Sequence, residues 1–156
     1  MEIDTSTTVQ QEFAQRLQHL LQEGFARMDL AVVESHYARD PGLRFADADG
    51  PWHRGWDAYR VWRSQVFSGA TVRKQAFAPR DIWTALIGPE TAVTTCIIDA
   101  TLWSVTETPP ARLITRLSIV WRQDGSDWRI VHEHFSPYTG AFARSLGYDE
   151  LGPRPR

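Results

Sequence analysis

The chain has 156 residues, the size of one ordinary domain, and its 42% hydrophobic and 12% aromatic content excludes a disordered protein. Its 17 Lys and Arg residues against 19 Asp and Glu residues give a net charge of −2, so we expect no nucleic-acid partner. The single cysteine, Cys96, excludes an internal disulfide and a four-thiolate zinc site, which favours a reducing compartment.

Two helices are predicted at the start of the chain. Residues 9–26 repeat apolar side chains at the three- and four-residue spacing of an amphipathic helix, with Thr7 or Thr8 as its N-cap. Asp29 is the expected N-cap of a second, shorter helix, which ends before the Asp-Pro-Gly turn at 40–42. The domain therefore opens with two consecutive helices.

A short strand and a third helix are predicted next. Residues 43–47 alternate as in a strand, and Asp49-Gly50-Pro51 ends it. Gly55 then precedes a helix over 56–67. One face of that helix carries Tyr59, Trp62, Arg63 and Val66.

From residue 71 the pattern changes to the two-residue period of strands. Five segments are rich in Val, Ile, Thr and Trp and are separated by Pro or Gly: 71–78, 81–88, 91–105, 112–123 and 127–136. Helices followed by long strands predict an α+β fold, with the helices packed on one face of a curved antiparallel sheet. We expect a single domain over 1–150 and a flexible tail at 151–156.

The N-terminus lacks the basic and apolar regions of a secretory signal, and the chain contains no apolar run long enough to span a bilayer. The sequence therefore predicts a cytoplasmic protein that has no membrane partner.

This order of elements resembles that of the nuclear transport factor 2-like superfamily. Residues 43–50, followed by 54–60, resemble its strand, turn and glycine-started helix. Residues 116–136 are similar to the final hairpin of the SnoaL-like branch and of the association domain of calcium/calmodulin-dependent protein kinase II. The resemblance implies a cone-shaped half-barrel around a small-molecule pocket, with the helices in its concave face, and a homodimer formed through the outer face of the sheet.

Asp47 is the first candidate for catalysis. Where the sequence is similar to ketosteroid isomerase, Asp47 falls on the residue that abstracts the proton. A partly buried carboxylate suits that task because it can take up a proton near neutral pH. The alternative is that Asp47 only caps the turn before Gly50.

Asp99 is the second candidate, because Asp is disfavoured in the middle of a strand. Similarity to the kinase association domain, which carries a pocket arginine at this position, places Asp99 inside the cone. Burial beside Ile97 and Trp103 would then let it act as a general acid or base. The alternatives are an ion pair, for instance with Arg63, and an edge position that faces water.

The last predicted strand carries different chemistry on its two faces. His132 and His134 share one face, and Glu133 and Phe135 share the other. Two such histidines can bind a metal only with a third ligand, which the spacing does not supply, so we expect no metal. The kinase comparison places Glu133 and Phe135 in the pocket and the histidines on the dimer face, an assignment that one bulge would invert.

The sequence predicts a small SnoaL-like enzyme that performs acid–base chemistry without a cofactor on an apolar or aromatic metabolite. The reaction would be an isomerisation, a cyclisation, a dehydration or an epoxide opening. Asp47 and Asp99 would transfer protons. The predicted substrate-binding residues are Tyr59, Arg63, Trp103, Glu133 and Phe135. The competing hypothesis is a non-enzymatic small-molecule-binding or oligomerisation domain, since fold does not decide between them.

Overall fold

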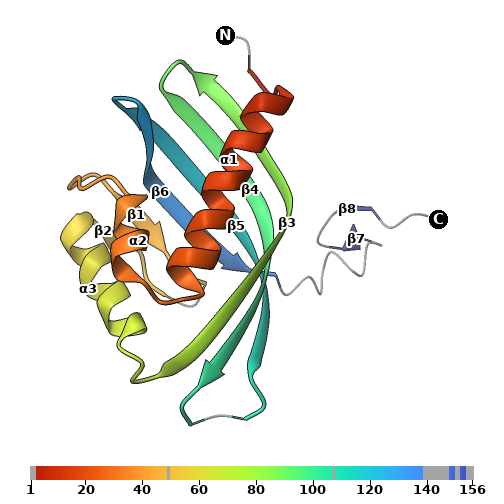
Figure 1. Ribbon diagram of the computed structural model, residues 1–156. Helices are drawn as coiled ribbons and strands as arrows, with labels where there is room; N and C mark the ends of the chain where they lie inside the picture. The colour runs from red at the N-terminus through yellow and green to blue at the C-terminus, as the bar shows by residue number, and fades with distance from the viewer. Residues whose placement is uncertain (1–2, 49, 107, 139–147, 150–151, 154–156) are drawn as a thin grey trace.

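Helices from the first half of the chain lie in the concave side of a curved sheet, as the computed structural model shows (Figure 1). The structure describes residues 3–48, 50–106, 108–138, 148–149 and 152–153. Below, the inner face of the sheet is the face that carries the helices, and the outer face is the opposite one. The α+β cone predicted from the sequence is confirmed.

The first predicted helix consists of two parts. The α-helix α1 spans Thr7–His19 and continues into a π-helix, η1, over Leu20–Phe25. The N-cap is Ser6, whose side chain accepts a hydrogen bond from the Val9 N–H, rather than Thr7 or Thr8. A stripe of apolar side chains is buried along both parts: Val9, Phe13, Leu17, Leu20, Leu21 and Phe25. This stripe fixes the helix on the inner face.

Two further helices flank the first short strands. Helix α2 spans Leu30–Ser35, and Asp29 caps it by accepting from Val32 N at 3.1 Å, as predicted. Strands β1, Arg44–Ala46, and β2, His53–Arg54, precede helix α3, Trp56–Phe67. Gly55 is the N-cap of α3 and has a φ of 85°, a conformation that favours glycine.

The sheet has the strand order β2-β1-β6-β5-β4-β3. Its long strands are β3, Val72–Gly88; β4, Thr91–Ser104; β5, Ala111–Asp124; and β6, Asp127–Pro137. These four pair in antiparallel fashion, as predicted, but β1 pairs with β6 in parallel. Because of this parallel pairing, Ala46 at the end of β1 lies beside His134 of β6.

Strand β3 joins two segments that the sequence pattern separates at Pro79. Pro79 pairs with Ile98 of β4, and the irregularity comes one residue later, between Arg80 and Trp83. Asp81 has a positive φ of 52° at that point. Proline has no backbone N–H to donate to a neighbouring strand. It is tolerated in β3 because β3 is an edge strand.

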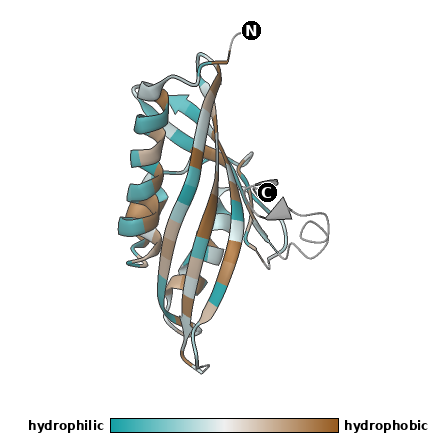
Figure 2. Ribbon diagram, turned by 90° about the vertical axis from the view of Figure 1, so that its right-hand side faces the viewer, coloured by the Kyte–Doolittle hydropathy of each residue, from teal (hydrophilic) through white to brown (hydrophobic). Residues whose placement is uncertain are grey.

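The core fills the space between the helices and the inner face. Phe13 of α1 packs edge-on against Trp121 of β5 and Trp128 of β6, with ring centroids 5.6 and 5.1 Å apart. Hydrophobic and hydrophilic segments both occur along the long strands (Figure 2), and successive side chains of each strand point to opposite faces. This alternation decides which residues can reach the interior of the cone.

The end of the chain is described only in part. Strands β7, Tyr148–Asp149, and β8, Gly152–Pro153, form a separate two-stranded sheet. Of the tail predicted at 151–156, only residues 152–153 are among the described residues. Within the described part of the chain, none of the helices has the length and apolar character needed to cross a membrane.

Candidate functional site

A cavity of about 260 Å³ lies between α3, the end of η1 and the inner face of the sheet. Most of its wall is apolar: Phe25, Ala48, Gly50, Trp62, Val66, Val72, Phe77, Ala100, Leu102, Leu113 and Phe135. The described polar residues that line it are Asp47, Arg63, Gln75 and Thr115. An apolar wall with a few polar groups is typical of a small-molecule site.

Asp47 follows β1 directly and reaches the cavity wall. Its Oδ1 accepts from Nη2 of Arg63 at 3.0 Å, and its Oδ2 accepts from Nη1 of Arg63 at 3.1 Å and from the indole N–H of Trp62. Each carboxylate oxygen has two lone pairs, so among the described residues Oδ1 keeps the greater capacity to accept a further hydrogen bond or a proton. The turn that follows is closed by the Asp47 carbonyl, which accepts from Gly50 N at 3.1 Å.

Arg63 joins the cavity to the interior. Helix α3 places Tyr59 and Arg63 four residues apart on one face, and Nε of Arg63 donates to the Tyr59 hydroxyl at 3.2 Å. Its Nη2 also donates to Oε1 of Glu133 at 3.0 Å, and the guanidinium lies over the Phe25 ring at 4.6 Å. With 6% of its side chain exposed, Arg63 is held in place by its partners.

Glu133 lies behind Arg63, fully buried on β6. Its Oε1 accepts from Arg63, and its Oε2 accepts from the Tyr37 hydroxyl. Burial raises the pKa of Glu133 to about 7, although Arg63 acts in the opposite direction. Burial and the neighbouring Glu133 carboxylate likewise raise the pKa of Tyr37. Glu133, which can gain or lose a proton near neutral pH, therefore lies directly behind Arg63, a residue of the cavity wall.

Three of the predicted site residues line the cavity: Asp47, Arg63 and Phe135. Tyr59 and Glu133 are outside the lining set and contact Arg63 from behind.

The two faces of β6 carry the residue pairs that alternation predicts, but the kinase comparison is only partly right, because Glu133 lies behind Arg63 and not in the cavity wall. Glu133 and Phe135 are buried on the inner side. The rings of His132 and His134 pack instead against Trp52, at 5.6 and 5.0 Å. The histidines therefore belong to the outer face of this strand.

The prediction that Asp99 and Trp103 line the pocket is wrong. Ile98, Ala100 and Leu102 occupy the inner positions of β4, so the residues that alternate with them point to the outer face. Asp99 accepts from Nε of Arg80 at 2.8 Å with 47% of its side chain exposed. Trp103 lies beside Lys74 there, with Nζ 4.6 Å from the ring centroid. The ion-pair alternative applies, with Arg80 rather than Arg63.

Sequence reasoning missed three polar residues at or behind the cavity, Tyr37, Gln75 and Thr115. Gln75 lines the wall and donates through its amide to the Phe25 carbonyl. Thr115 stands out in the pattern of β5 because it shares an otherwise apolar face with Leu113 and Leu117. That signal was available in the sequence, whereas Tyr37 has no local pattern that links it to a residue of β6.

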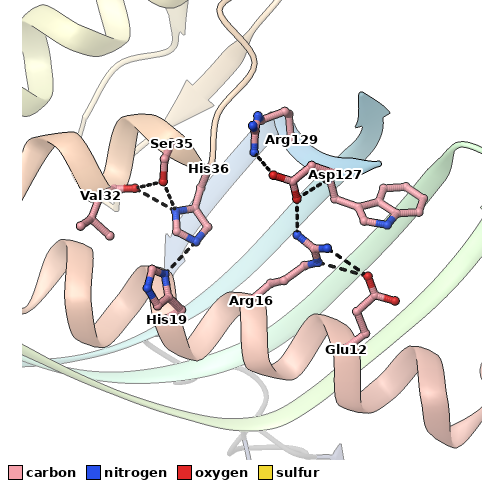
Figure 3. Close-up of polar contacts among 9 residues, drawn as sticks. Glu12, Arg16, His19, Val32, Ser35, His36, Asp127 and Arg129 are labelled. Atoms are coloured by element: carbon pink, nitrogen blue, oxygen red, sulfur yellow. Dashed lines mark hydrogen bonds and ion pairs between the residues drawn. The ribbon is translucent and has the colours of Figure 1, made fainter. Parts of the chain in front are cut away.

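A second polar cluster lies between α1, α2 and β6, away from the cavity lining (Figure 3). Arg16 bonds both Glu12 and Asp127, and Asp127 also accepts from Arg129. Burial opposes ionisation of Asp127, but the hydrogen bonds it accepts outweigh burial and lower its pKa to about 2.

The histidines of this cluster form a pair of their own. His19 Nδ1 and His36 Nε2 are 3.2 Å apart, and burial lowers the pKa of His36. In the part of the chain that the structure describes, no three His, Cys, Asp or Glu side chains are grouped so as to hold a metal. The cluster ties α1 to the start of β6 through the bond between Arg16 and Asp127.

Comparison with known proteins gives one family match. A family model described as a SnoaL-like domain matches residues 15–140. A search of curated proteins found no significant match.

Several solved structures are similar to this chain. A nuclear transport factor 2-like superfamily protein from Salmonella enterica is 23% identical with a TM-score of 0.71, covering 84% of this chain and 92% of its own. A candidate scytalone dehydratase from Novosphingobium aromaticivorans is 13% identical with a TM-score of 0.72, covering 83% and 85%. A candidate calcium/calmodulin-dependent protein kinase type II association domain from Thiobacillus denitrificans is 19% identical with a TM-score of 0.57, covering 78% and 90%. These similarities establish the fold of the chain.

Proposed function

The chain belongs to the SnoaL-like domain family, and we propose that it is a small enzyme that performs acid–base chemistry on a neutral, apolar metabolite. The observation that carries this proposal is the position of Asp47 at the wall of an apolar cavity, with acceptor capacity left on Oδ1. A positioned carboxylate of this kind serves as a general base.

In the proposed reaction, Oδ1 of Asp47 takes a proton from a C–H or O–H group of the bound molecule. Arg63 holds the carboxylate by two hydrogen bonds and so fixes the direction of Oδ1. Glu133 acts as a positioning residue, because it holds the other side of Arg63. Isomerisation and dehydration both begin with such a proton transfer, and dehydration agrees with the name of the similar protein from Novosphingobium aromaticivorans.

Hydrogen–deuterium exchange tests the proposal without knowledge of the natural substrate. We would incubate 2-tetralone, a neutral bicyclic ketone with acidic C–H groups, with the protein in D₂O and follow loss of the α-proton signal by NMR. As Asp47 gains the α-proton, the electron pair of the C–H bond passes into the carbonyl group and gives the enolate of 2-tetralone. The partly exposed carboxyl exchanges its proton for a deuteron from the solvent and returns that deuteron to the enolate carbon, which forms the C–D bond. We expect exchange above the buffer rate, reduced about a hundredfold in Asp47→Asn.

Asp99→Asn is the matched control, since it makes the same change on the outer face. It should exchange 2-tetralone at the wild-type rate. Equal rates for Asp47→Asn and the wild type would contradict the proposal. Binding of 2-tetralone without any accelerated exchange would contradict the proposed base and favour the second candidate.

The second candidate is a binding or oligomerisation domain without catalysis. It is favoured by the closed ion pair of Asp47, which already accepts three hydrogen bonds from Arg63 and Trp62. Exposed apolar side chains on the sheet, such as Trp83 and Ile114, would suit the homodimer proposed from the sequence. Sedimentation at micromolar concentration would detect that dimer, and a monomer would contradict it.

A further inference from the structure

Thr115 is a buried polar residue in the cavity wall that lacks a hydrogen-bond partner. Only 3% of the residue is exposed, and its Oγ1 contacts no donor or acceptor among the described residues. The residue lines the cavity from β5. Buried hydroxyls are nearly always hydrogen-bonded, so a buried, unpaired hydroxyl on a residue that lines a cavity is a candidate contact for a ligand.

The described residues that line the cavity around Thr115 do not supply the hydroxyl with a hydrogen-bond partner. The lining residues of the neighbouring strands β4 and β6 are apolar, namely Ala100, Leu102 and Phe135, and so is Leu113 on β5 itself. Gln75, the other uncharged polar residue of the wall, already donates to the Phe25 carbonyl. A valine would fill the same space as Thr115 without an unsatisfied hydroxyl, so packing alone does not explain the threonine.

The charges in the wall restrict the kind of ligand. Asp47 and Arg63 are the charged residues among the described lining residues, and they pair with each other at 3.0 Å. The wall therefore offers no unpaired charge to compensate a buried ion, which would be costly to desolvate. A neutral molecule fits this wall best.

We propose that the Thr115 hydroxyl is a specificity contact that donates to an oxygen acceptor, such as a carbonyl, of a neutral apolar ligand whose proton-donating group faces Asp47. This inference rests on the proposed function, since it assigns the substrate class of the same cavity. The ligand is thus an apolar molecule with an oxygen at a distance from the reacting C–H or O–H group. An apolar molecule without that oxygen leaves the Thr115 hydroxyl unsatisfied.

Two probes of equal shape separate this inference from simple apolar binding. 2-Acetylnaphthalene carries a carbonyl oxygen, and 2-isopropenylnaphthalene replaces it with a CH₂ group. We would measure the Kd of both by fluorescence titration against the wild type, Thr115→Val and Thr115→Ser. Thr101→Val, on the outer face of β4, makes the same change outside the cavity.

We expect the wild type to bind the ketone about tenfold more tightly than the hydrocarbon, the value of one satisfied buried hydrogen bond. Thr115→Val should bind both probes with the affinity that the wild type has for the hydrocarbon. Thr115→Ser and Thr101→Val should keep the preference for the ketone. Thr115→Val without ligand should melt at or above the wild-type temperature, which verifies that it folds.

A control inside the cavity distinguishes the two ways of failing. Ala100→Met reduces the cavity volume, and Ala78→Met makes the same change at an exposed position of β3. If both probes bind, only Ala100→Met blocks them, and Thr115→Val keeps the ketone preference, the role of Thr115 is refuted while the cavity remains the binding site. If neither probe binds the wild type, or Ala100→Met has no effect, the proposed function fails together with the inference.

Discussion

The inner and outer faces of the sheet each display an arginine–carboxylate pair, but the two pairs differ in their surroundings. On the inner side, Arg63 is almost fully buried between Asp47 and Glu133. On the outer side, Asp99 and Arg80 form their ion pair in contact with water. Removal of one partner leaves an uncompensated buried charge in the first case and a solvated charge in the second.

The comparison also explains why only one pair is suited to chemistry. A carboxylate at the inner face adjoins an apolar cavity from which a ligand excludes water, and electrostatic effects are strong there. The Asp99 carboxylate is screened by solvent, so a bound molecule would gain little from it.

Arg63→Met should have the largest effect. The variant leaves the fully buried Glu133 and the partly exposed Asp47 without their cation, and we expect it to lower the free energy of unfolding by about 3–5 kcal/mol at pH 8. Urea denaturation measures this loss. Arg60→Met on the same helix breaks the exposed pair with Glu34 and should cost at most about 1 kcal/mol. Equal losses for the two variants would refute the distinction between the buried and the solvent-exposed ion pair.

Glu133→Gln should change how stability depends on pH. The pKa of Glu133 is raised by burial from 4.5 to about 7, so ionisation opposes folding. The wild type should therefore lose stability as the pH rises from about 4.5 to about 7 and then level off. Glutamine cannot ionise but can still accept from Arg63.

The variant should match the wild type near pH 4.5 and be more stable at pH 8, by about 3 kcal/mol at most. Urea denaturation across this range measures the difference. A difference that stays constant with pH would show that Glu133 is ionised throughout.

Asp99→Asn should have the smallest effect. The pair with Arg80 is half exposed, and pairs of that kind contribute at most about 1 kcal/mol. We expect a melting temperature close to that of the wild type over the whole neutral range. A loss above about 2 kcal/mol in urea denaturation would mean that the outer face is covered, for instance by a second copy of the chain.

Local pattern is sufficient to predict much of this fold. The predicted helix over 56–67 has the observed bounds, because its spacing and the preceding Gly55 are local signals. The division of β6 into a face with Glu133 and Phe135 and a face with His132 and His134 also follows from alternation.

Local pattern could not place Asp99, because both sides of β4 carry buried isoleucine. Ile97 and Ile98 are neighbours that point to opposite faces, and each is at most 5% exposed. Only the packing of the helices identifies the inner face. The bond between Tyr37 and Glu133 joins residues 96 positions apart, a distance over which spacing carries no information.

The position of a bound probe, located by NMR, shows directly whether the cavity beside Asp47 is the binding site. Leu113 lines the cavity, and its neighbour Ile114 is exposed on the outer face, so their methyl groups report the two sides of the same strand. Nuclear Overhauser effects from bound 2-tetralone should reach the methyl groups of Leu113 and Leu102 and not that of Ile114. Contacts to Ile114 with none to Leu113 would show that the ligand binds the outer face, and would contradict the assignment of Asp47 as its base.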